Sequence, residues 1–188
     1  MGILLAFAPF IAFALIDRLV GSTEGLVVGA IVSFVLIARD VTASKRSPKI
    51  LEIGTALLFS ALALYAVMGR PTWSVIGVRL CVDAGLLAIV LVTMALKRPF
   101  TLQYAREQVD PVFHGSPKFV RTNYIISATW AVAFAVMVAA ELALLYLPTM
   151  PHRIGVLAII LALVGAVKFT GWYPDHVRGK AGAEVPEP

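Results

Sequence analysis

Three ionisable residues, Arg79, Asp83 and Glu141, lie well inside long apolar segments of the sequence. Arg79 and Asp83 are four positions apart, so on a helix they share one face and can form an ion pair. Glu141 lies in a later apolar segment and can join that pair if the two helices touch. Charged residues within a membrane span are costly and often functional. We therefore treat the three as a candidate intramembrane polar cluster: a structural ion pair, a proton or ion path, or a site for a polar ligand.

Other chemistry-bearing residues are scattered. The three histidines lie in three different polar segments, and the only cysteine is Cys81, inside an apolar segment. No cluster has metal-ligand spacing, and no nucleotide-binding or hydrolase motif is present. We expect no enzymatic activity, no cofactor and no metal. The alternative is a lipid-acting membrane enzyme, which would use the polar residues of one loop, Arg106, Glu107, Asp110 and His114.

The composition indicates the environment. The chain has 188 residues, of which 60% are hydrophobic and 14% are charged, whereas soluble domains are about 45–50% apolar and about 25% charged. This excludes a soluble globular domain and a disordered chain. The net charge of +5 is typical of membrane proteins that concentrate Lys and Arg in cytoplasmic loops, so we expect lipid and not nucleic acid as the surroundings.

The apolar runs predict an all-α integral membrane protein. Backbone polar groups in lipid must be satisfied within the chain, so the runs should be helices in a compact bundle. We predict a transmembrane domain over 1–173 and a flexible cytoplasmic tail over 174–188. Six spans are expected, at about 1–20, 21–38, 50–68, 73–96, 123–147 and 154–172. The first run is short for a bilayer core of about 30 Å, so a partial first helix and a five-span count remain the alternative.

The polar loops predict the orientation. Most Lys and Arg residues fall in alternate connections and in the tail, with few in the others. Because positive residues stay in the cytoplasm, both ends are expected inside. The longest inner loop covers 97–122. Its Leu102, Ala105 and Val109 share a helical face, which predicts a short interfacial helix within 100–109, and 110–117 is typical of a loop.

Small residues recur at every fourth position in the second run. They are Gly21, Gly25, Gly29 and Ser33. Such a ladder lets two helix backbones approach closely in lipid. We expect it to pack inside the bundle, and the alternative is a contact with a second copy of the chain or with another membrane protein.

Several short segments together resemble one bacterial family. They are Phe7-Ala-Pro-Phe10, Lys97-Arg-Pro-Phe100, Thr129-Trp-Ala-Val-Ala-Phe134, and Glu141 and Tyr146 before Pro148. With the hydropathy layout of about residues 4–173, they are similar to the intracellular septation protein A family of inner-membrane-spanning proteins. The resemblance implies a multi-pass protein of the bacterial inner membrane that supports cell division and envelope integrity, with other division or envelope proteins as partners. A small proton- or solute-translocating transporter or channel that uses Arg79, Asp83 and Glu141 is the alternative.

Overall fold

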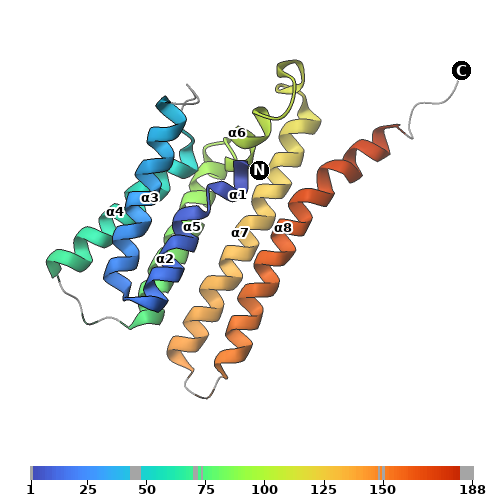
Figure 1. Cartoon of the computed structure of the whole chain (residues 1–188). Coiled ribbons are helices and arrows are strands. Elements are labelled where there is room, and N and C mark those ends of the chain that lie inside the picture. Colours follow the sequence, from blue (N-terminus) through green and yellow to red (C-terminus); the bar gives the residue numbers. More distant parts are fainter. Residues whose placement is uncertain are drawn as a thin grey trace, which may run out of the picture. The chain divides into compact units, whose positions relative to one another are not determined.

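The computed structural model describes residues 2–42, 48–69, 72, 74–147, 149 and 151–182. Over this part of the chain the secondary structure is helical, without a β-strand. In chain order the elements are α1 (Gly2–Leu5), α2 (Ala8–Leu19), α3 (Ser22–Thr42), α4 (Ile50–Gly69), α5 (Val75–Ala95), α6 (Phe100–Arg106), the short 3-10 helix η1 (Pro111–Phe113), α7 (Pro117–Tyr146) and α8 (His152–Gly182) (Figure 1). The predicted all-α class is confirmed. The chain divides into two units, residues 1–93 and 94–188, which are described separately.

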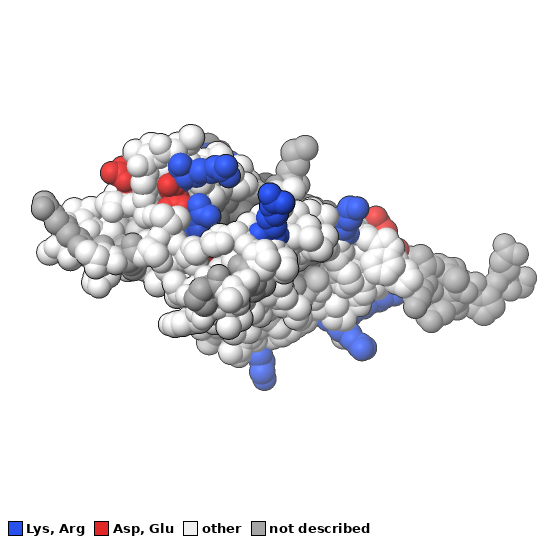
Figure 2. All heavy atoms as spheres, turned by 90° about the horizontal axis from the view of Figure 1, so that it is seen from below, with Lys and Arg blue, Asp and Glu red and all other residues white. Residues whose placement is uncertain are grey.

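Five helices are long and apolar enough to cross a membrane. They are α3, α4, α5, α7 and the His152–Val177 part of α8. On the face shown in Figure 2, lysine, arginine, aspartate and glutamate are few, and most atoms belong to other residue types. The helix composition therefore supports a multi-pass membrane protein.

The first predicted span, 1–20, is instead divided between α1 and α2. Pro9 lies in the first turn of α2, where its missing N–H costs no helix hydrogen bond. The 12 residues of α2 extend over about 18 Å, short of a bilayer core of about 30 Å. The region of the first predicted span therefore forms a four-residue and a 12-residue helix, and the number of membrane spans stays a prediction.

The first unit packs α2, α3, α4 and α5 around one apolar core. Its buried members are Phe13 from α2, Leu26 from α3, Phe59, Ala63 and Ala66 from α4, and Val78 and Val82 from α5. The break between α2 and α3 is only two residues long, which makes these two helices antiparallel neighbours (Figure 1). This core fixes which helix faces meet, and it thereby positions the charged side chains described below.

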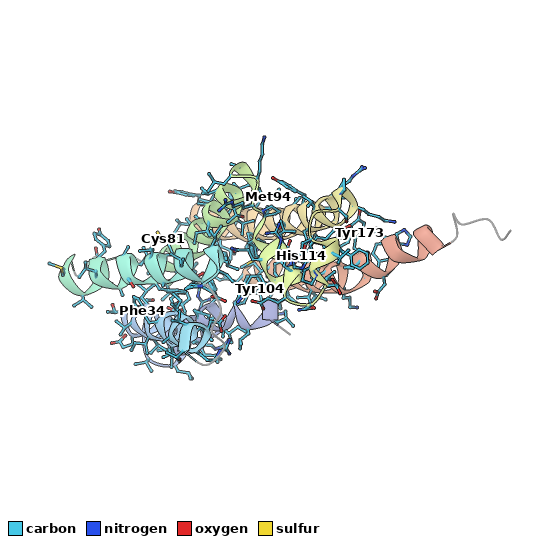
Figure 3. The ribbon with its side chains drawn as sticks, turned by 90° about the horizontal axis from the view of Figure 1, so that it is seen from above. Phe34, Cys81, Met94, Tyr104, His114 and Tyr173 are labelled. Carbon is cyan, nitrogen blue, oxygen red and sulfur yellow. The ribbon has the colours of Figure 1, made fainter. Side chains whose placement is uncertain are left out.

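In the second unit, α7 packs against α8, and α6 packs against α7. The helix α7 begins at Pro117, six residues before its predicted start, because the Ser116 hydroxyl accepts the Phe119 N–H at 3.1 Å and Pro117 occupies the first turn. The short helix predicted within 100–109 is present as α6. Its buried residues are Phe100, Thr101, Leu102 and Tyr104, and Figure 3 labels Tyr104.

The last helix continues beyond its predicted end. The sequence predicts that the helix stops at 172 and that a flexible tail begins at 174, but α8 runs to Gly182 with Pro174 inside it. A proline within a helix removes one backbone hydrogen bond and can bend the helix without ending it. The predicted helix end at 172 is thus wrong, whereas the flexible cytoplasmic tail stays a prediction, and residues 183–188 lie outside the described part of the chain.

Candidate functional site

Arg79 forms an ion pair with Asp17, which lies in a different helix of the first unit. The Nε and Nη2 atoms of Arg79 both donate to Asp17 Oδ2, at 2.8 and 2.6 Å. The Asp17 side chain is 0% exposed and that of Arg79 is 41% exposed. The pair joins the last turns of α2 to the second turn of α5. A buried carboxylate requires a partner of opposite charge, and Arg79 supplies it.

The turn between α2 and α3 completes the surroundings of Asp17. The Ser22 hydroxyl, at the first residue of α3, donates to Asp17 Oδ1 at 2.6 Å. Both carboxylate oxygens therefore accept short hydrogen bonds, one from a charged donor and one from a neutral donor. Asp17 consequently links three helices of the first unit, α2, α3 and α5.

A second buried charge cluster joins α3 to α4. Lys49 Nζ lies 2.8 Å from Asp40 Oδ2 and 3.3 Å from Glu52 Oε1. The Lys49 backbone N–H also donates to Glu52 Oε2 at 3.1 Å. These three residues are 3–8% exposed. Arg39, whose side chain is 47% exposed, donates to Asp40 Oδ1 at 2.8 Å, so two cations balance two carboxylates. We call Asp40, Lys49 and Glu52 the α3–α4 ion cluster.

The three residues predicted as one polar cluster are divided between the two units. Arg79 and Asp83 lie one turn apart on α5, in the first unit, and the ion pair described for Arg79 is with Asp17. Asp83 is half-buried. Glu141 lies on α7 in the second unit and is 4% exposed.

The glycine ladder of α3 faces two different neighbours. A Cβ atom added at Gly25 would lie 3.0 Å from the backbone of α2, at Phe13 O and Asp17 N. At Gly29 it would lie 2.7 Å from the ring of Phe59 on α4. At Gly21 it would meet the flexible end of the Glu24 side chain, at 2.6 Å. Ser33 is 2% exposed and donates its hydroxyl to Gly29 O at 2.8 Å. Gly25, Gly29 and Ser33 are therefore buried within the first unit, whereas Gly21 is only half-buried.

The loop whose polar residues a lipid-acting enzyme would use makes local contacts that stabilise its own fold. Asp110 accepts the Val112 N–H at 3.0 Å and so caps η1. A ring nitrogen of His114, labelled in Figure 3, lies 2.8 Å from Val109 O, and the ring stacks on Phe119. These contacts hold the turn that leads into α7. Among the described residues, no group of three or more His, Cys, Asp or Glu could hold a metal ion.

Polar side chains of the second unit connect its helices. Thr101 on α6 donates to Asn123 O at 2.8 Å and shares a 2.8 Å hydrogen bond with the Ser127 hydroxyl. Trp130 on α7 donates from Nε1 to the Thr170 hydroxyl on α8, at 2.9 Å. Each contact pairs a buried polar group across a helix interface, as an apolar medium requires.

Sequence reasoning missed Asp17 and the α3–α4 ion cluster. It read Asp17 and Asp40 as the ends of apolar runs, counted Lys49 among the cations of an inner loop, and assigned no function to Glu52. One local signal was present: Lys49 and Glu52 have the spacing of neighbours on a helix, directly after the short connection that follows Asp40. No comparable signal exists for Asp17 and Arg79, which are 62 positions apart.

No protein-family model, no curated protein and no solved structure matches this chain.

Proposed function

We propose that this chain is a non-enzymatic, multi-pass protein of the bacterial inner membrane that supports cell division and envelope integrity. The resemblance of its sequence to the septation protein A family suggests this role. One structural observation supports it: the buried charges of the first unit are used to join helices. Asp17 and Arg79 link α2 to α5 at 2.6 Å, and Lys49 links Asp40 of α3 to α4 at 2.8 Å.

Ion pairs that join neighbouring helices suit a protein that holds one helix arrangement and binds partner proteins. Helices in lipid gain little from the hydrophobic effect, so van der Waals packing and polar contacts between helices determine their arrangement. Breaking a buried ion pair by removing one partner costs about 3–5 kcal/mol. The two pairings therefore favour one arrangement of α2–α5, whose outward apolar faces would contact lipid and partner membrane proteins.

A deletion strain tests the proposed role. The bacterium that carries the gene would be grown without it, and cell length, septum frequency and survival under osmotic and detergent stress would be measured. We expect elongated cells or envelope sensitivity, restored by the wild-type gene. Complementation by Asp17→Asn should be poorer than by Arg153→Gln, which removes an exposed charge at the start of α8. Normal division and normal stress survival in the deletion strain would refute the proposal.

We also infer an even number of membrane crossings with both ends in the cytoplasm. The distribution of Lys and Arg supports this orientation. An even number of crossings requires that the short α2 spans the membrane in addition to the five longer helices. Single cysteines would be introduced into a Cys81→Ser background at Ser44, Ser116, Thr72 or Thr149. An impermeant maleimide applied to intact cells with a permeable outer membrane should label the last two positions only. Labelling of Ser44→Cys or Ser116→Cys would contradict the orientation.

A small transporter is the second candidate. Glu141 supports it, because this carboxylate is 4% exposed within the membrane-length helix α7, and ionisable groups in such positions often belong to ion or proton paths. Purified protein would be reconstituted in liposomes that contain a pH-sensitive dye. Proton or solute flux that is lost in Glu141→Gln and in Asp83→Asn would support transport. Flux that is unchanged in both variants would remove this candidate.

A further inference from the structure

We propose that the Arg79 guanidinium, held in place by Asp17, binds a phosphate group at the end of the first unit where α2 ends and α5 begins. The phosphate is that of a lipid headgroup or a free phosphate anion. This proposal does not depend on the proposed role in cell division, because it follows from the geometry of one ion pair.

The ion pair occupies only part of the guanidinium. An arginine side chain has five N–H donors. The two bonds from Nε and Nη2 end on the same oxygen, Asp17 Oδ2, and so use two of the five. Asp17 Oδ1 accepts from Ser22. The Asp17 carboxylate thus holds the Nε and Nη2 edge of the guanidinium, and Nη1 is not part of that edge.

The exposure of the two partners is unequal. The Asp17 side chain is 0% exposed, whereas 41% of the Arg79 side chain is open to the surroundings. Large apolar side chains close in sequence to the two partners are also exposed: Leu19 at 76% and Val20 at 67% follow Asp17, and Val75 at 50% precedes Arg79. Arg79 therefore has, besides its bonds to Asp17, exposed N–H donors that can bind a further polar partner.

Phosphate is the partner that fits this donor set. A guanidinium presents a planar fork of N–H groups that matches two phosphate oxygens, and such charge-assisted bonds are short and strong. Arg79 is four residues after the first residue of α5, about 6 Å along the helix axis. The long arginine side chain can reach a headgroup from that depth.

Other charges occur at the same turn and supply a matched control. Arg18 and Glu24 are exposed, one at the end of α2 and one near the start of α3. The double variant Arg18→Gln/Glu24→Gln removes one cation and one carboxylate and leaves Arg79 with Asp17. The test variant Asp17→Asn/Arg79→Gln makes the same change in charge at the ion pair and retains an uncharged, hydrogen-bonding pair.

The experiment measures lipid binding by native mass spectrometry of detergent-purified protein. The probes are dioctanoyl phosphatidylglycerol, dioctanoylglycerol without phosphate, and inorganic phosphate. We expect wild type and Arg18→Gln/Glu24→Gln to bind the phospholipid equally, and Asp17→Asn/Arg79→Gln to bind it at least about tenfold more weakly. Displacement of the phospholipid by inorganic phosphate would assign the site to a free anion, and binding of the phospholipid alone would assign it to a headgroup.

A second variant allows for failure of the first to fold. Arg79→Lys keeps the positive charge beside Asp17 but loses the planar fork, so we expect a several-fold weaker phospholipid affinity with an unchanged elution profile. Equal phospholipid binding by wild type and all variants would overturn the proposal. Binding of dioctanoylglycerol as tightly as the phospholipid would also overturn it.

Discussion

Removal of the Lys49 ammonium group should weaken the attachment of α3 to α4. In Lys49→Met, the apolar stem of the side chain is largely kept, but Asp40 and Glu52 lose their shared cation. Both carboxylates are less than 10% exposed, at 3% and 8%. They would stay buried in a medium that disfavours unpaired charge.

The expected magnitude follows from the contacts. Removing one partner of a buried ion pair costs about 3–5 kcal/mol. The lower end applies here because two compensating bonds remain: Arg39 still donates to Asp40 Oδ1, and the backbone N–H of residue 49 still donates to Glu52 Oε2. We therefore expect Lys49→Met to lose about 3 kcal/mol of unfolding free energy.

The assay is reversible unfolding in mixed detergent micelles, followed by circular dichroism as the fraction of dodecyl sulfate is raised. Arg39→Gln is the matched control, because it removes the other cation on Asp40 but from a side chain that is 47% exposed. Exposed pairs contribute about 0–1 kcal/mol. The triple variant Asp40→Asn/Lys49→Met/Glu52→Gln removes all three charges and should recover most of the lost stability, because no uncompensated charge stays buried.

The result that refutes this reasoning is a Lys49→Met variant no less stable than Arg39→Gln. It would mean that the α3–α4 ion cluster contributes nothing beyond a surface pair. A triple variant less stable than Lys49→Met would also contradict the argument, since the loss would then come from packing and not from unpaired charge.

Three further predictions concern backbone positions, and the same unfolding assay checks them. Gly25→Ala and Gly29→Ala should each lower the free energy of unfolding by about 1–3 kcal/mol, because the added methyl group meets a helix backbone or a buried ring. Gly21→Ala should change it by less than about 0.5 kcal/mol. Equal effects at all three positions would contradict the described packing. Gly165→Ala should gain up to about 1 kcal/mol, because open space surrounds the added methyl group and alanine favours the helix; a loss would indicate a contact at that face. Lys97 has a φ of 57°, in the left-handed region that glycine adopts freely, so Lys97→Gly should gain about 1 kcal/mol, and an unchanged midpoint would show that this strain is absent.

The apolar runs predicted the long helices well where the helix ends coincide with the ends of the apolar segments. The run 50–68 corresponds to α4 (Ile50–Gly69), and 73–96 corresponds to α5 (Val75–Ala95). The start of α7 was missed because a serine cap and a proline fix it within polar sequence. The end of α8 was missed because the apolar run ends at 172, although the helix continues through Pro174.

The candidate site was less predictable, because it depends on which helices touch. Periodicity places Arg79 and Asp83 on one face of α5, and that inference needs only helix geometry. The partner of Arg79 in the structure, however, is Asp17 on α2. Selecting it requires the antiparallel packing of α2 on α3 and the placement of α5 against the same core. No spacing in the sequence carries that information.

Charges at the ends of apolar runs therefore carry two kinds of information in this chain. Lys and Arg near the ends of apolar runs can set orientation through their attraction to the cytoplasmic side. Arg18 and Arg39 are both exposed, and Arg39 also donates to Asp40. Asp17 and Asp40, each adjacent in sequence to one of these arginines, point into the first unit and pair with Arg79 and Lys49. An Arg-Asp or Asp-Arg pair at a run end thus places one charge outside the bundle and one inside it. Low overall charge does not imply an apolar interior, because a few carboxylates at helix ends suffice to link neighbouring helices.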